Sequence, residues 1–208
     1  MPTYTSPQDW TTLDTFLQDA TPTTNYSASV NVVIGEVNSA AQKHRSLFQF
    51  PGLTNGDIPP AAIVTSAKLY LLLKTDYSSN ARTFRVYRSK RDVNISQCTW
   101  NIWKTGSSWA SAGGFGADDC EQTDIGSLSF TATETMATWK EFSLTPSAIQ
   151  AIISGAWTTP TLFVKADTET DDAYEFHSSN ATTSTNRPYL VVEYALGGQV
   201  IIWTSGQR

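Results

Sequence analysis

Hydrophobic and polar residues alternate with a period of two along most of this chain. Runs with this period are rich in Val, Ile, Phe and Tyr and end at clusters of Gly, Pro, Asn, Asp and Ser, as β-strands do. The predicted strands cover residues 30–34, 46–50, 63–73, 83–88, 139–144, 161–165, 173–177 and 189–194. Because each strand offers one apolar face, the pattern predicts an all-β fold in which two antiparallel sheets pack as a sandwich.

Two segments depart from this alternation. Residues 145–153 begin with a Thr-Pro pair and then place apolar residues at helical spacing, which predicts one short helix that ends near Gly155 and closes one end of the sandwich. Residues 96–126 are irregular and contain three tryptophans and a Gly-Gly-Phe-Gly sequence. A loop of this length in a compact domain is either functional or packed by its own large side chains.

The composition narrows the classes of protein to consider. The chain of 208 residues contains 29 Thr and 22 Ser, whereas only 16% of its residues are charged. An aromatic content of 12% argues against disorder. A net charge of -5 disfavours a nucleic-acid partner, and no apolar run is long enough to insert into a membrane as a helix. The first six residues lack the basic and then apolar order of a secretory signal.

The two cysteines, Cys98 and Cys120, leave two alternatives open. They can form one disulfide, which closes a loop of about 22 residues and stabilises the fold by roughly 3 kcal/mol in the entropic model. They can equally remain two buried thiols. Two cysteines without neighbouring histidines do not indicate a zinc site.

The C-terminal end carries a separate feature. Residues 1–195 contain the predicted strands of the domain, and residues 196–208 form a tail in which Gly197 and Gly198 precede another apolar strand. An exposed apolar strand needs a surface that covers it, either on its own domain or at the sheet edge of a neighbouring subunit. The candidate assembly residues are Val200, Ile201, Ile202 and Trp203.

Several short motifs, taken in order, resemble those of one known family. They are Asp14-Thr15-Phe16-Leu17, Pro22-Thr23-Thr24-Asn25-Tyr26, Arg45-Ser46-Leu47-Phe48-Gln49-Phe50, Ile63 to Leu71, Thr99-Trp100-Asn101 with Gly106, Trp109 and Gly113, Trp139 to Ile152, Phe176-His177-Ser178-Ser179, and Arg187 to Tyr194. The chain departs from the family pattern at Ser27, where a glycine is expected, and in one extra residue before Ser66.

The family that these motifs resemble is the DNRLRE domain, also called the disaggregatase-related or silk-like carbohydrate-binding module. The resemblance spans residues 14–195. It implies a β jelly roll without catalytic activity of its own. Members resemble accessory modules of secreted polysaccharide-active proteins, surface adhesins and bacteriophage virion proteins.

The residues themselves give little support for catalysis. Neither His44 nor His177 lies in a nucleophile or metal motif, and Ser178-Ser179 lacks the glycines of a nucleophile elbow. Asp118 and Asp119 are adjacent in one loop, whereas glycoside hydrolysis needs two carboxyl groups held across a cleft. We therefore expect no enzyme activity.

A cofactor is not expected, with calcium as the exception to consider. Residues 167–172 are rich in oxygen ligands and connect two predicted strands. The candidate metal ligands are Asp167, Glu169, Asp171 and Asp172, with Asp14 as a weaker candidate. The alternative is an acidic turn in contact with water, since the loop lacks the spacing and glycine of an EF-hand.

Glycan binding would use aromatic rings as flat platforms. The candidates are Trp100, Trp103 and Trp109, with Asn101 beside them. Trp100 and Trp109 match family positions and are equally interpretable as packing residues, whereas Trp103 does not match and is the better candidate for an exposed platform.

Two functions follow from these observations. The first is a non-enzymatic virion accessory protein on a capsid or tail surface, which assembles as a homo-oligomer or with capsid or tail proteins through its β-sandwich faces and C-terminal strand. Hydroxyl-rich faces of low charge suit such interfaces, where Lys and Glu are depleted. The second is an extracellular carbohydrate-binding or adhesion module of a polysaccharide-active protein, whose partners are surface glycans.

Overall fold

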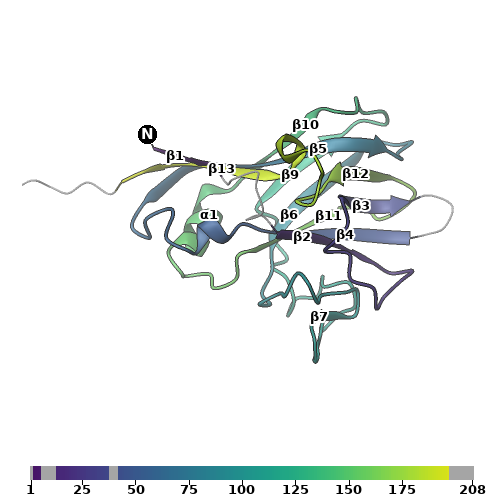
Figure 1. The fold of residues 1–208 in the computed structure, drawn as a ribbon, viewed down its shortest axis with the longest axis horizontal. Helices are drawn as coiled ribbons and strands as arrows, with labels where there is room; N and C mark the ends of the chain where they lie inside the picture. Colours follow the sequence, from purple (N-terminus) through teal and green to yellow (C-terminus); the bar gives the residue numbers. More distant parts are fainter. Residues whose placement is uncertain (1, 6–12, 38–41, 197–208) are drawn as a thin grey trace, which may run out of the picture.

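The computed structural model describes residues 2–5, 13–37 and 42–196. Strands dominate the described chain (Figure 1). They are β1 (Thr3–Thr5), β2 (Leu13–Gln18), β3 (Asn31–Val37), β4 (Gln42–Gln49), β5 (Ile63–Asp76), β6 (Arg82–Arg88), β7 (Ile102–Lys104), β8 (Ser107–Ser108), β9 (Gly126–Phe130), β10 (Trp139–Leu144), β11 (Thr161–Ala166), β12 (Ala173–His177) and β13 (Tyr189–Ala195). The described residues add one α-helix, α1 (Pro146–Ile153), and the short 3₁₀ turns η1 (Pro51–Leu53) and η2 (Ser184–Asn186). The predicted all-β class with one short helix is therefore confirmed.

The alternating pattern predicts a sandwich of two stacked sheets, and the structure corrects this prediction. Apart from the small β7–β8 pair, the strands belong to one sheet, whose path β5-β10-β9-β6-β11-β4-β3-β12 returns to β5 and closes a barrel. Closure depends on β5, whose 14 residues are long enough to pair with β10 on one side and with both β12 and β13 on the other. Strand length and pairing partners, which alternation does not reveal, decide between the two architectures.

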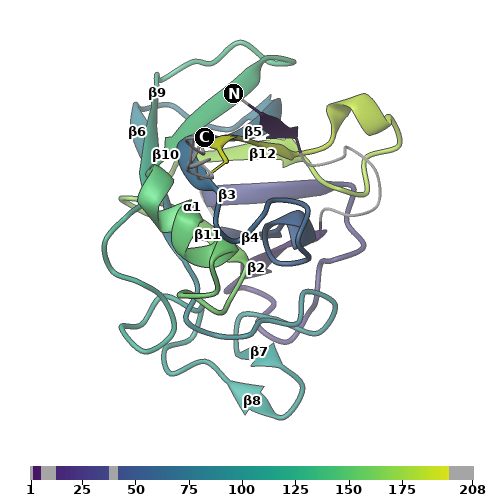
Figure 2. The ribbon, with the colours of Figure 1, turned by 90° about the vertical axis from the view of Figure 1, so that its left-hand side faces the viewer.

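Helix α1 follows the predicted signals. Thr145 occupies the N-cap position with extended backbone angles, Pro146 begins the helix, and Gly155 just beyond its end has a positive φ of 77°. Ala148, Ile149, Ile152 and Ile153 are buried in the main core, and the helix packs against β5 at one end of the barrel (Figure 2).

The main core fills the barrel, and a second apolar cluster lies outside it. Phe48 of β4 and Leu162 of β11 point into the main core, whereas their neighbours Leu47 and Phe163 belong to the second cluster. That cluster is covered by residues 89–125, here called the loop layer, which carries β7 and β8 and lies on the β2–β4 side of the barrel (Figures 1 and 2). The long irregular segment is thus packed by its own large side chains.

No helix among the described residues has the length and apolar character needed to cross a membrane.

Candidate functional site

The loop-layer tryptophans do not form a common platform. Trp109 is buried, its ring lies against Gly114, and its indole N–H donates to the Thr99 carbonyl oxygen at 2.9 Å. Trp100 is half-buried, with the Arg45 guanidinium over its ring at 4.8 Å from the centroid. The expectation that Trp109 binds a glycan is therefore corrected, because its ring contributes to the second cluster instead of the surface.

Trp103 and Asn101 remain nearer to solvent. Trp103 is half-buried against the second cluster, and the Lys104 ammonium lies 4.3 Å from its ring centroid. Asn101 is exposed; its backbone N–H donates to Pro22, and its carbonyl oxygen accepts from Trp109. One half-buried ring with a cation above it offers a small platform at most.

Both cysteines are free thiols buried in the second cluster. Of the two alternatives, a disulfide or two buried thiols, the structure has the buried thiols. The Sγ of Cys98 donates to the Ile95 carbonyl oxygen, and that of Cys120 donates to the Arg88 carbonyl oxygen. Burial raises the pKa of each thiol to about 12, so neither is a reactive thiolate near neutral pH.

The four proposed calcium ligands do not converge on one point. Glu169 forms a two-pronged ion pair with Arg45, with N–O distances of 2.6 and 2.7 Å. Asp172 is buried, pairs with Arg82 at 2.6 Å, and accepts backbone N–H bonds from residues 79 and 80. Asp167 accepts from the next backbone N–H, and Asp171 adopts a left-handed φ of 50°. Within the described residues, no three His, Cys, Asp or Glu side chains gather in a way that could hold a metal ion.

The proposed assembly residues Val200, Ile201, Ile202 and Trp203 lie outside the described residues, as does most of the tail. Two apolar side chains are exposed where the described part of the chain ends. Leu196 is 60% exposed, and Ile63, which pairs with Ala195 at the end of β13, is 58% exposed.

An aromatic cluster that sequence reasoning missed lies on the outer surface of β10, β5 and β13. Tyr70 and Tyr189 are register partners whose rings stack at 4.6 Å and 9°, and Trp139 meets Tyr189 edge-on at 4.9 Å. Trp139 is 37% exposed, and both tyrosines are half-buried. We call these three residues, together with Lys68 and Glu141, the aromatic face.

Polar contacts orient the Tyr70 ring of the aromatic face. The Tyr70 hydroxyl donates to one Glu141 oxygen at 2.6 Å, and the Lys68 ammonium binds the other at 2.8 Å. Partial burial and the neighbouring Glu141 carboxylate raise the pKa of Tyr70 to about 12, so its hydroxyl keeps its proton. Hydrogen bonds from Lys68 and Tyr70 lower the pKa of Glu141 below its usual value. The aromatic row therefore lies beside an ion pair, Lys68–Glu141, whose two charges cancel.

Strand alternation carries a signal for this face. In the segment Trp139–Leu144, Phe142 and Leu144 are buried in the core while Trp139, Glu141 and Ser143 share the opposite side. A large aromatic residue on the polar side of an amphipathic strand therefore marks Trp139 from the sequence alone. Its edge-on contact with Tyr189 depends on pairing through β5, which the sequence does not reveal.

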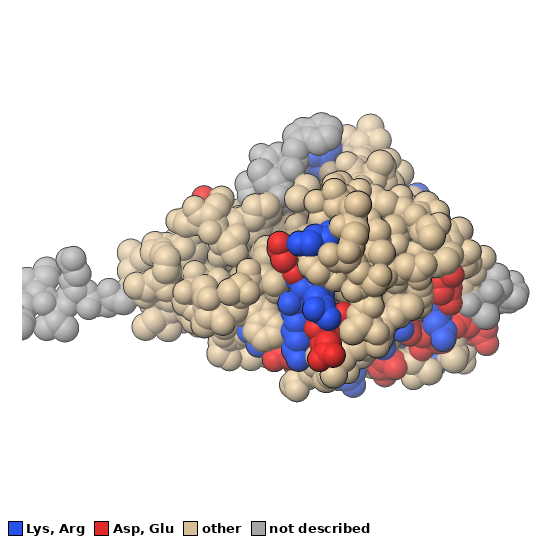
Figure 3. Space-filling model, turned by 90° about the horizontal axis from the view of Figure 1, so that it is seen from below, with Lys and Arg blue, Asp and Glu red and all other residues tan. Residues whose placement is uncertain are grey.

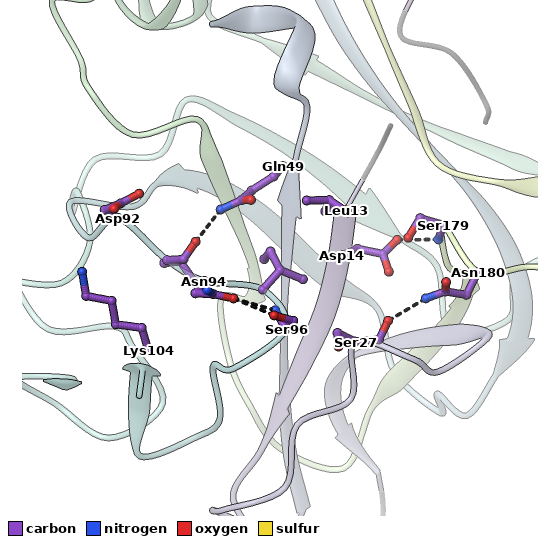
Figure 4. Close-up of a pocket in the computed structure, with 12 residues that line it drawn as sticks. Leu13, Asp14, Ser27, Gln49, Asp92, Asn94, Ser96, Lys104, Ser179 and Asn180 are labelled. Atoms are coloured by element: carbon purple, nitrogen blue, oxygen red, sulfur yellow. Dashed lines mark hydrogen bonds between the residues drawn. The ribbon is translucent and has the colours of Figure 1, made fainter. Parts of the chain in front are cut away.

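A groove of about 650 Å³ opens at the start of β2, between the loop layer and the turn after β12 (Figure 4). Its lining residues are Leu13, Asp14, Ser27, Gln49, Asp92, Val93, Asn94, Ile95, Ser96, Lys104, Ser179 and Asn180. Nine of these offer polar side chains, and none is aromatic. The volume lies within the range of small-molecule sites.

Motifs that are far apart in the sequence meet at this groove. A carboxylate oxygen of Asp14 accepts the backbone N–H of Ser179 at 2.6 Å. The amide of Asn180 donates to the Ser27 carbonyl oxygen, also at 2.6 Å, and that of Asn25 donates to the carbonyl oxygens of residues 95 and 98. These bonds connect β2, the Asn-Tyr turn and the Ser-Ser segment. The three motifs therefore have a common structural role at the edge of the groove.

The surface on the loop-layer side shows no field of one sign. Figure 3 shows a mainly uncharged face on which acidic and basic side chains lie next to each other. Residues of the loop layer form the ion pairs Arg88–Glu121 and Arg91–Asp119, and Arg45 of β4 pairs with Glu169. Such a face lacks the basic stripe that binds a phosphate backbone.

Comparison with known families agrees with the motifs. A family model described as "Disaggregatase related repeat domain" matches residues 14–192, nearly all of the described chain. No curated protein matches the sequence.

Proposed function

Since the chain belongs to the disaggregatase-related repeat domain family, we propose that it is a glycan-binding domain without catalytic activity of its own. In this proposal, the aromatic face binds an uncharged polysaccharide. The observation that carries it is the row formed by Trp139, Tyr189 and Tyr70, which is partly exposed and in which the two tyrosines stack and Trp139 contacts Tyr189 edge-on.

The chemistry of the face suits a pyranose ring. Aromatic rings combine a large apolar area with a negative face that attracts the polarised C–H groups of a sugar. The Lys68 and Glu141 side chains lie beside the rings and offer a donor and an acceptor to sugar hydroxyls. Since the rings are already fixed, binding immobilises few side chains, which lowers its entropic cost.

The charges of the face favour a neutral ligand. Lys68 and Glu141 neutralise each other at 2.8 Å, and Glu193 adds an exposed negative charge at the edge of the same strands. An acidic polysaccharide would meet repulsion there. Hydrogen bonds from Lys68 and Tyr70 lower the pKa of Glu141, the carboxylate of the aromatic face, which favours its ionised form over that of a proton donor.

Replacement of Trp139 by Ala tests this function. We expect the variant to bind a neutral polysaccharide at least ten-fold more weakly, a loss of about 1.4 kcal/mol, because the most exposed ring is removed. Affinity electrophoresis through gels containing neutral or acidic polysaccharides measures the effect. Tyr77→Ala is the matched control, since Tyr77 is 40% exposed outside the aromatic face. Equal retardation of wild type and Trp139→Ala in a gel that retards wild type would contradict the proposal.

We propose assembly through the C-terminal end as a second function, as in a virion accessory protein that contacts copies of itself or capsid or tail proteins. The exposed Leu196 and Ile63, at the end from which the apolar tail continues, support it. Deletion of residues 197–208 is expected to leave the domain folded and to convert an oligomer into a monomer. Light scattering after size exclusion measures this, and an unchanged oligomer mass in the truncated protein would contradict it.

A further inference from the structure

The groove at the start of β2 contains a buried carboxylate without a cationic partner. Asp14 is 2% exposed, and no Lys, Arg or His of the described chain forms an ion pair with it. Within the described residues, the backbone donor to its carboxylate is the Ser179 N–H at 2.6 Å. Burial raises the pKa of Asp14 to about 7, although hydrogen bonds from Ser179 act in the opposite direction. A buried carboxylate of this kind is stabilised by any cation that reaches it.

The amide side chains in the groove are oriented by their bonds to the protein. The Gln49 amide nitrogen donates to the Val93 carbonyl oxygen at 2.8 Å and to the Thr161 hydroxyl at 2.7 Å. The Asn180 amide nitrogen donates to the Ser27 carbonyl oxygen. Because both NH₂ groups are engaged, the two amide oxygens are the groups left to face a ligand. The groove therefore offers acceptors and favours a ligand rich in donors.

The charged residues of the groove are separated. Figure 4 shows Lys104 and Asp92 at one end, and Asp14 with Ser179 and Asn180 at the other. The Lys104 ammonium lies over the Trp103 ring, 4.3 Å from its centroid. The end that holds Asp14 thus has a negative group, neutral acceptors and open volume beside it.

We propose that this groove binds an amino sugar, with the primary ammonium group at Asp14 and the ring hydroxyls donating to the Gln49 and Asn180 amide oxygens. An ammonium group needs only a few acceptors, whereas calcium needs 6–8 oxygen ligands. A volume of about 650 Å³ accommodates one or two sugar units. The site is separate from the aromatic face, and its test is independent of the function proposed for that face.

Isothermal titration with 6-amino-6-deoxy-D-glucose tests the proposal, and D-glucose is the neutral control ligand. At pH 7.5 the amino sugar is expected to bind at least ten-fold more tightly than glucose. The Asp14→Asn variant should lose this ten-fold preference, whereas Asp57→Asn, which changes an exposed carboxylate elsewhere, should keep it. n-Butylamine, which has the ammonium group without hydroxyls, should bind more weakly than the amino sugar.

A second measurement on the wild-type protein avoids any dependence on how the variant folds. At pH 6.5 Asp14 is partly protonated, so binding of an ammonium group should release a fraction of a proton. Titrations in two buffers of different ionisation enthalpy measure this release, which glucose should not produce. Equal affinity for amino sugar and glucose, equal affinity for butylamine, or heats independent of the buffer would each overturn the proposal.

Discussion

Replacement of Trp109 by Ala is expected to lower the free energy of unfolding by about 3–5 kcal/mol, the usual cost of removing a buried Trp or Phe side chain. The Trp109 ring is 5% exposed and fills the second cluster between the barrel and the loop layer. Its loss also leaves the Thr99 carbonyl oxygen without the indole N–H that it accepts at 2.9 Å. Urea unfolding followed by circular dichroism measures the change.

Trp103→Ala is the control for this prediction. Trp103 lies in the same loop layer but is half-buried, so its replacement is expected to cost roughly 1 kcal/mol. Similar losses for the two variants would mean that the loop layer does not depend on Trp109 for its attachment to the barrel. A large loss confined to Trp109 would identify this tryptophan as a packing residue, in keeping with its place in the structure.

Local structure could be predicted from the sequence where alternation is regular. The predicted strand 139–144 coincides with β10, 173–177 coincides with β12, and the helix begins at Pro146 as the Thr-Pro pair indicates. These predictions succeed because the period of side-chain burial is a property of each segment by itself. Closure of the barrel is a property of which strands pair, and the 14 residues of β5 decide it.

Predictions about chemistry failed where long-range contacts decide the outcome. The acidic loop 167–172 looked like a set of cation ligands, yet Arg82 and Arg45 bind two of its carboxylates from other strands. The tryptophans of the loop layer are packed or half-buried, whereas Trp139 is exposed because it lies on the outer side of β10. Asp14 lies in a sequence motif of β2, but the hydrogen bond to its carboxylate comes from Ser179 in the Ser-Ser segment, 165 residues later.

The pH dependence of stability should depend strongly on Asp14. Its pKa is raised by burial to about 7 from an ordinary value of 3.8, so the folded protein retains a proton that the unfolded chain has released between these values. Stability therefore falls as pH rises from about 4 to about 7, and the charged form costs about 4 kcal/mol above that range. The Asp14→Asn variant removes this charge while keeping an oxygen that can accept the Ser179 N–H.

The test compares the free energy of unfolding of Asp14→Asn with that of wild type at each pH. Asp14→Asn should be more stable than wild type at pH 8 by up to about 4 kcal/mol. This gain should shrink towards pH 4, where Asp14 is protonated in the folded protein and partly protonated in the unfolded chain. Urea unfolding at pH 4.5, 6 and 8 measures it, with Asp57→Asn as the exposed control. A constant difference across the three pH values would contradict the buried, uncompensated charge. If an ammonium ligand occupies the groove, its addition at pH 8 should stabilise wild type and not the variant, because only the carboxylate supplies the opposing charge.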